Sequence, residues 1–306
     1  MPPSSSADSS LFLKVAPLAF VVLWATGFVL ARLTVGHVEP ISFLAYRFPV
    51  AGLLLLALSP FLKVKWLKPR DALHAMVVGV LIHAGYLAPI YWAVAHGLPA
   101  GVSALIVGLQ PLITAFLAAL VLKEVVTPRH WMALLAGIFG VALVLSPKFS
   151  FESLGGITPL TAGLALFGCF SVASGTVYQK RFASNLPLVS SVIWQYVSAG
   201  LVVAVLAAWL EEFKFDQSPQ AWFAIIWSVV VISLGAIFML MRLIREGSVA
   251  KVSTLIFLVP GVASLMTFVL FDEQLDAVQI LGMALCAGAV LIINLQQRRQ
   301  QAPKSP

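Results

Sequence analysis

Long apolar runs, separated by short polar or Pro/Gly-rich breaks, dominate this chain. Ten of these runs are long enough to cross the hydrocarbon core of a membrane, which is about 30 Å thick. Lipid offers backbone amides no hydrogen-bonding partner, so segments of this length are expected to be helices. The pattern predicts an all-α polytopic membrane protein with ten transmembrane helices. The predicted spans are residues 14–34, 40–60, 73–95, 99–122, 129–146, 158–180, 187–209, 220–244, 249–271 and 276–295.

One stretch of the chain occurs twice, at residues 97–124 and 247–273. The copies share Gly, Ala, Val, Ser, Leu and Ile in step, after which Pro111 matches Pro260 and Glu124 matches Glu273. Each half has five predicted helices, an odd number, so the second half enters the membrane from the opposite side. We therefore expect two inverted repeats with the functional site between them. The expected segments are a disordered cytoplasmic tail at 1–13, a first five-helix repeat at 14–147, a linker at 148–157, a second five-helix repeat at 158–295 and a cytoplasmic tail at 296–306.

Composition and charge fit a membrane protein and exclude a nucleic-acid-binding one. Of 306 residues, 60% are hydrophobic and 10% are charged, against roughly 25% charged in soluble domains. The formal charge is +7, but fifteen of the nineteen Lys and Arg residues fall on the side of the membrane that holds the N-terminus. By the positive-inside rule, this asymmetry places both termini in the cytoplasm. The basic residues therefore report topology, and no nucleic-acid partner is expected.

Candidate substrate-binding residues are aromatic or polar side chains inside the predicted spans. Trp24 lies nearer to the middle of its span than to a headgroup belt, although an interfacial anchor is the alternative. His83 and Tyr86 share a helical stripe with Leu87, Ile90 and Tyr91, although a histidine hydrogen-bonded within the bundle is the alternative to a ligand contact. The full candidate set is Trp24, Tyr46, His83, Tyr86, Ser171, Tyr178, Trp194 and Phe238.

A second set of residues is expected to shape or gate the bundle. Arg47 is the only charged residue well inside a predicted span, so it either serves a function in the bundle or extends to the outer interface. Pro111 and Pro260 each remove a helical hydrogen bond and should bend their helices. Glu124 and Glu273 fall at the membrane boundary, where we expect Glu124 to tie helices four and five together rather than to carry a proton.

Residues for catalysis or metal binding are not expected. The five histidines show no i, i+3 or i+4 pairing, no two acidic residues lie within one span, and Cys169 and Cys286 lack metal-ligand spacing. We therefore expect no cofactor and no metal. An integral-membrane enzyme and a purely structural membrane protein remain as alternatives from other classes.

The chain resembles the drug/metabolite transporter superfamily, specifically its ten-helix EamA-type branch. The matching motifs are LWATGF in helix one, YRF in helix two, SALIVGLQP with KE in helix four, TVYQKR in helix six, and REG with STLIFLVP through DE in helices eight and nine. TVYQKR and the run GYLAPIYWAVAHGLPAGVSALIVGLQP are most similar to bacterial exporters of amino acids, including aromatic ones. The resemblance implies a central cavity, with the family's motif positions at Trp24, Arg47, Pro111, Glu124, Pro260 and Glu273.

This resemblance implies a secondary transporter that exports small metabolites, most of all neutral amino acids, by alternating access in the bacterial cytoplasmic membrane. Small four-helix relatives couple to protons through a glutamate in their first helix, which is absent here, so facilitated diffusion is favoured. A proton-coupled antiporter that uses His83 is one alternative. A transporter of nucleotide sugars or other phosphorylated metabolites is another, but it would need more interior cations than Arg47. The expected partners are a small-molecule substrate and membrane lipid, and a monomer is compatible with the sequence.

Overall fold

The computed structural model describes residues 6–34, 36–98, 100–146, 157–246, 249–271 and 276–301, which form helices and no named strand. The α-helices are α1 (Ser6–Thr34), α2 (Pro40–Leu58), α3 (Pro69–Gly79), α4 (Gly85–Ala95), α5 (Ala100–Val107), α6 (Gln110–Val121), α7 (Pro128–Leu145), α8 (Pro159–Tyr178), α9 (Leu188–Leu210), α10 (Pro219–Trp227), α11 (Ile237–Glu246), α12 (Val249–Thr254), α13 (Leu258–Phe271) and α14 (Ala277–Gln301). Short segments of other helical type connect some of them: the π-helical η1 (Val80–Ala84), η4 (Gln179–Ala183) and η5 (Ser228–Ala236), and the 3₁₀ segment η6 (Leu255–Phe257).

Proline at the first turn sets where many of these helices begin. Pro40, Pro69, Pro128, Pro159 and Pro219 start α2, α3, α7, α8 and α10. Proline suits this position because its φ angle is already helical and its missing N–H would have no partner there. The residue before each of these prolines is extended, which ends the preceding loop.

Helical segments that can cross a membrane account for most of the described chain. Eight are long and apolar enough to do so, and two shorter apolar stretches lie at Val15–Gly27 and Ala277–Ile293. The protein is therefore a multi-pass membrane protein. The first helix differs from the predicted one, because α1 begins at Ser6 and includes most of the segment predicted as a disordered tail. No proline or glycine occurs between Ser6 and Ala16 to stop the helix.

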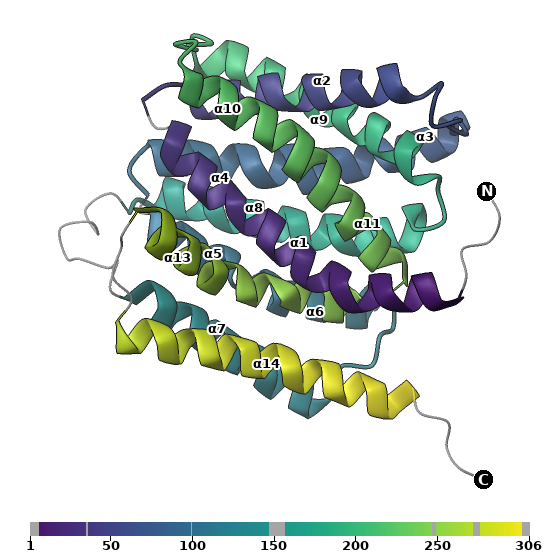
Figure 1. Ribbon diagram of the computed structural model, residues 1–306, viewed down its shortest axis with the longest axis vertical. Helices are drawn as coiled ribbons and strands as arrows, with labels where there is room; N and C mark the ends of the chain where they lie inside the picture. Colours follow the sequence, from purple (N-terminus) through teal and green to yellow (C-terminus); the bar gives the residue numbers. More distant parts are fainter. Residues whose placement is uncertain are drawn as a thin grey trace.

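The two halves of the sequence interlock. The principal helix contacts are α7 with α14, α2 with α9, α4 with α8, α3 with α9, α1 with α13 and α6 with α8. Each pair joins a helix from before residues 147–156 to one from after them. Figure 1 shows α2 and α9 together at one edge of the bundle and α7 and α14 together at the opposite edge, with α1 and α13 between them. The start of α1 and the end of α14 lie on the same side of the bundle (Figure 1).

Small residues bring α7 and α14 into close contact. A Cβ atom added to Gly140 would lie 2.8 Å from the Cys286 sulfur, and one added to Gly282 would lie 2.6 Å from the Gly140 carbonyl oxygen. The Cys286 thiol donates to the Gly137 carbonyl at 3.6 Å. In lipid, association of this kind depends on close packing of helix backbones, and Cys286 acts as one of the small packing residues.

Both copies of the repeated stretch contain an interrupted helix next to their proline. The first copy leaves α-helical geometry at Gly108 and Leu109, immediately before α6, which has Pro111 in its first turn. The second copy passes through η6 before α13, which contains Pro260 near its start. Proline cannot donate the helical hydrogen bond at its own position, so the break falls in the preceding turn in each copy. The predicted distortion of these two helices is thus present.

Candidate functional site

Polar side chains from four elements meet inside the bundle. Arg47 of α2, His83 of η1, Gln195 and Tyr196 of α9, and Ser233 of η5 are all buried, and we call them the polar core. The Arg47 Nε donates a hydrogen bond to the Ser233 Oγ at 2.8 Å, and the Tyr196 hydroxyl donates to the Ser233 carbonyl. These two bonds connect α2 and α9 to the π-helical segment η5. Non-α-helical turns of this kind are frequent at functional sites.

His83 has a neutral hydrogen-bond partner and two aromatic neighbours, and Arg47 is its charged neighbour. Its Nε2 hydrogen-bonds to the Gln195 Oε1 at 3.3 Å, and its ring lies 5.5 Å from the Phe48 ring and 5.1 Å from the Tyr196 ring. The Gln195 amide in turn donates to the Ser191 hydroxyl at 3.2 Å. The imidazole is therefore hydrogen-bonded within the bundle, which was the alternative to a ligand contact.

A small apolar cluster joins two of the predicted substrate residues. Tyr86, Ile90 and Val172 are buried together, and Trp24 packs against them from α1. Leu87 and Val107 complete this group, which we call the aromatic cluster. Such a surface suits a flat or branched apolar side chain.

The single stripe predicted for the third span is divided between these two groups. His83 contacts the polar core, whereas Tyr86 and Ile90 contact Val172 of α8. The cause is η1, because a π-helical turn accommodates an extra residue and rotates the residues that follow it. The i, i+3, i+4 spacing of an ideal α-helix therefore does not hold from His83 to Tyr86.

Three of the predicted substrate residues use their hydroxyl groups in contacts between segments. The Tyr46 hydroxyl donates to the Phe213 carbonyl at 3.0 Å, in the loop between α9 and α10. The Ser171 hydroxyl donates to the Leu81 carbonyl at 2.9 Å, and the Tyr178 hydroxyl hydrogen-bonds to the His74 Nδ1 at 2.8 Å. None of these three is part of the polar core or the aromatic cluster as the described residues define them.

Trp194 and Phe238 are half-buried. The Trp194 indole N–H is buried and has no hydrogen-bond partner among the described residues. Phe238 packs against the main apolar core. Their predicted contact with substrate stays a prediction.

Glu124, one of the predicted gating residues, contacts the second half of the chain. The Val249 backbone N–H donates to the Glu124 carboxylate at 3.1 Å, so Glu124 contacts the first turn of α12 in the second half. This contact forms because α12 begins with backbone N–H groups that lack helical partners and attract an anion. The tie expected between helices four and five stays a prediction. Glu273 lies outside the described residues.

Loops from the two halves are joined at the end of the bundle that carries the α1–α2 connection. The Ile41 N–H and the Ser42 N–H and hydroxyl donate to the Glu211 carboxylate at 2.8, 2.6 and 2.7 Å, and Glu211 thereby caps α2. In return, the Glu39 carboxylate accepts from the Glu212 and Lys214 N–H groups at 3.0 and 2.9 Å. We call residues 37–46 with 211–218 the loop clamp.

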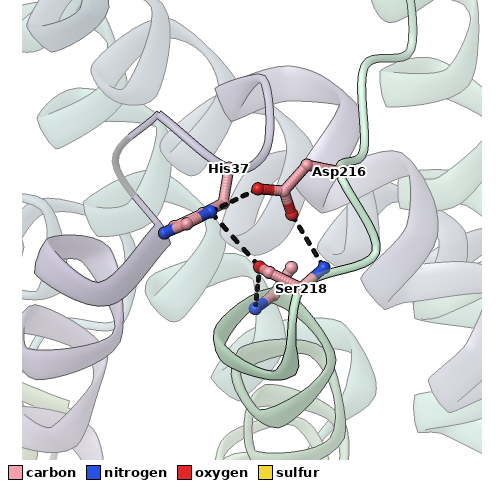
Figure 2. A network of polar contacts seen from close by, with 4 residues as sticks. His37, Asp216 and Ser218 are labelled. Carbon is pink, nitrogen blue, oxygen red and sulfur yellow. Dashed lines mark hydrogen bonds and ion pairs between the residues drawn. The ribbon is translucent and has the colours of Figure 1, made fainter.

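His37, Asp216 and Ser218 in the loop clamp have the residue types of a hydrolytic triad but not its geometry (Figure 2). The same His37 Nδ1 contacts the Asp216 carboxylate and, at 3.2 Å, the Ser218 hydroxyl. In a triad the two ring nitrogens divide these contacts, so that the serine can be deprotonated. Here the Ser218 oxygen caps α10 by accepting from the Ala221 N–H. The bonds from His37 and Ser218 also lower the pKa of the Asp216 carboxyl from 3.8 to about 2.

Metal ligands do not gather in the described part of the chain: it holds no group of three or more His, Cys, Asp or Glu side chains that could bind an ion.

Sequence reasoning identified Arg47 and His83 but not their partners. Gln195, Tyr196 and Ser233 are separated from them by more than a hundred residues, and the loop clamp pairs side chains 179 residues apart. One signal was present: Gln195 and Tyr196 occupy in the second half the region that Tyr46 and Arg47 occupy in the first.

Comparison with known proteins supports a transporter. The EamA-like transporter family matches residues 14–146 and 160–295. Similar proteins include the uncharacterized transporter YvbV of Bacillus subtilis (25% identity, covering 93% of this chain and 92% of that protein) and the probable amino-acid metabolite efflux pump of Escherichia coli (25% identity, 95% and 97%). A crystal structure with 19% identity, covering 94% of this chain and 98% of its own, superposes with a TM-score of 0.78 and shows the same fold. The chain belongs to the EamA-like transporter family.

Proposed function

We propose that this membrane transporter exports small neutral metabolites, above all amino acids with aromatic or other apolar side chains, from the bacterial cytoplasm. One observation carries this proposal: the bundle interior contains one buried arginine, Arg47, neutral hydrogen-bonding side chains around it, and the aromatic cluster. A zwitterion with an apolar side chain matches that combination. A similar protein is named as a probable amino-acid metabolite efflux pump, which agrees with this substrate class.

We propose ten membrane crossings in two inverted repeats, with both termini in the cytoplasm. The two shorter apolar stretches in α1 and α14 would supply the first and last crossings. The family matches the chain in two ranges of similar length, and α1 starts on the side where α14 ends (Figure 1). In this topology the loop clamp lies on the outer side and the Glu124–Val249 contact on the inner side, so each could open in turn during alternating access. A single chain holds both repeats and can work as a monomer.

We propose facilitated diffusion as the mode of transport. All twelve acidic residues lie at the ends of the spans or outside them. His83 hydrogen-bonds to the neutral Gln195 amide, and its charged neighbour is the cation Arg47, which disfavours a second positive charge on the imidazole. Proton coupling needs a group that changes its charge while it faces substrate and solvent in turn, and a carboxylate is the usual choice. Phosphorylated substrates fit less well, because they need several cations and Arg47 is the only one well inside a predicted span.

The test is uptake into proteoliposomes from a panel of labelled solutes. Phenylalanine, tyrosine, leucine and threonine represent the proposed class, and a nucleotide sugar and a purine nucleoside represent competing ones. We expect saturable uptake of the apolar amino acids above that of protein-free liposomes. Uptake of the nucleotide sugar without any amino acid would overturn the proposal.

A further inference from the structure

Arg47 lies in the bundle interior with most of its hydrogen-bonding capacity unused. The residue is only 6% exposed, so its side chain does not extend to the outer interface, which was one of the two expectations for it. The Nε–H donates to Ser233, and the guanidinium carbon lies 5.6 Å from the centre of the Phe48 ring. The two terminal nitrogens have no hydrogen-bond or ionic partner among the described residues.

No negative charge in the described interior compensates Arg47. Its electrostatic neighbours are Tyr91, Tyr196 and His83, none of which is an anion at neutral pH. The ion pairs among described residues, such as Arg242 with Glu246, lie at helix ends or in loops. A charge in a membrane-spanning segment is costly, and one that faces the bundle without a counter-ion indicates a place for a ligand.

We propose that the two terminal nitrogens of Arg47 bind the carboxylate of the transported molecule. This inference rests on the proposed function and narrows it to carboxylate-bearing substrates. The planar guanidinium presents paired N–H groups that match the two oxygens of a carboxylate, which a lysine ammonium cannot do. The substrate then supplies the missing counter-charge only while it is bound.

Ser233 is the positioning residue for this contact. Its hydroxyl accepts from the Arg47 Nε–H, and its carbonyl is itself held by the Tyr196 hydroxyl. This bond fixes the plane of the guanidinium and leaves the N–H groups of both terminal nitrogens for a ligand. Arg47 thus binds the carboxylate, and Ser233 sets its direction.

The alternative is that Arg47 only links α2 to η5. If Arg47 only links the two segments, it should have the same effect on the binding of every substrate. If it binds a carboxylate, the protein should bind molecules with a carboxylate more tightly than molecules without one. A competition experiment on the wild-type protein distinguishes these two roles of Arg47. Unlabelled 3-phenylpropionate, which lacks the amine, and unlabelled phenethylamine, which lacks the carboxylate, are each tested as inhibitors of labelled phenylalanine uptake. We expect inhibition by 3-phenylpropionate at a concentration at least about tenfold lower than by phenethylamine.

The variants Arg47→Lys and Arg47→Gln complete the test. The control is Arg242→Gln, which removes an arginine outside the site. We expect the half-saturating concentration of phenylalanine to rise about tenfold or more in Arg47→Lys, and Arg47→Gln to lose the preference for 3-phenylpropionate. Ser233→Ala should raise the half-saturating concentration with the maximal rate retained, and Ser233→Thr should restore it. Arg242→Gln should change neither value.

Two outcomes separate this inference from the proposed function. If the wild type transports phenylalanine but phenethylamine inhibits as well as 3-phenylpropionate does, the Arg47 inference is wrong and the transport function stands. If no amino acid is transported, but 3-phenylpropionate raises the melting temperature of the wild type and not of Arg47→Lys, the carboxylate site stands and the proposed function fails. Should Arg47→Gln not fold, the competition in the wild type and the Arg47→Lys variant still decide the question.

Discussion

Gly79 shows, at the scale of a single residue, how closely two helices approach. A Cβ atom added there would lie 2.2 Å from the Gln195 carbonyl oxygen and 2.4 Å from the Ser198 hydroxyl. The first neighbour is backbone and cannot rotate away. Gly79→Ala should therefore separate α3 from α9, next to the polar core, and destabilise the protein by about 1–3 kcal/mol.

The matched control is Gly163→Ala on α8, where an added Cβ meets nothing within 4 Å. Alanine is the better helix former, so this change should be neutral or stabilising by up to about 1 kcal/mol. Thermal unfolding of the purified variants in detergent measures both effects. Equal melting temperatures for the two variants would contradict the described α3–α9 contact.

Among whole elements, the loop clamp depends on Glu211. Its carboxylate satisfies two backbone N–H groups at the start of α2, which have no helical partner, and it also complements the helix dipole. We expect Glu211→Ala to cost about 1–2 kcal/mol of stability and Glu211→Gln to cost less, because the amide keeps an acceptor but loses the charge.

The neighbouring Glu212→Ala is the control for this prediction. Glu212 forms an ion pair with Lys214 in which both side chains are more than two-thirds exposed, and such pairs contribute little. Thermal unfolding should rank the stabilities as wild type close to Glu212→Ala, then Glu211→Gln, then Glu211→Ala. A loss at Glu212 as large as at Glu211 would show that general loop charge, not the cap, holds the clamp.

Asp216 gives the loop clamp a pH dependence with a defined sign. The pKa of this carboxyl is lowered from 3.8 to about 2 by hydrogen bonds from His37 and Ser218. The stabilisation is therefore complete above pH 3.8 and is lost as the pH falls toward about 2. Melting temperatures of wild type and Asp216→Asn should differ by a constant amount between pH 5 and 7 and converge below about pH 4. A difference that persists unchanged to pH 2 would refute this assignment.

At the scale of the whole molecule, local signals in the sequence predicted the spans well. Eight predicted spans coincide with membrane-length helices to within a few residues, because apolar length and proline-initiated turns are local features. The helix breaks near Pro111 and Pro260 were predicted for the same reason.

Features that depend on distant residues were not predictable from local patterns. Ideal helical periodicity placed His83 and Tyr86 on one face, but η1 separates them. Likewise, nothing near Glu124 in the sequence indicates that its carboxylate meets Val249. Contacts between interlocked halves are set by tertiary packing, which a single sequence does not display.

The central claim is that this transporter works by facilitated diffusion: its spans have no acidic residue away from their ends, and the substrate moves down its own concentration gradient. The most direct measurement is counterflow of labelled phenylalanine into proteoliposomes preloaded with unlabelled phenylalanine, with and without an imposed pH gradient and a protonophore. The account predicts the same transient accumulation of label without a pH gradient, with a pH gradient, and with a pH gradient plus the protonophore. Accumulation that requires the pH gradient and is abolished by the protonophore would contradict it and would make His83 the candidate proton carrier.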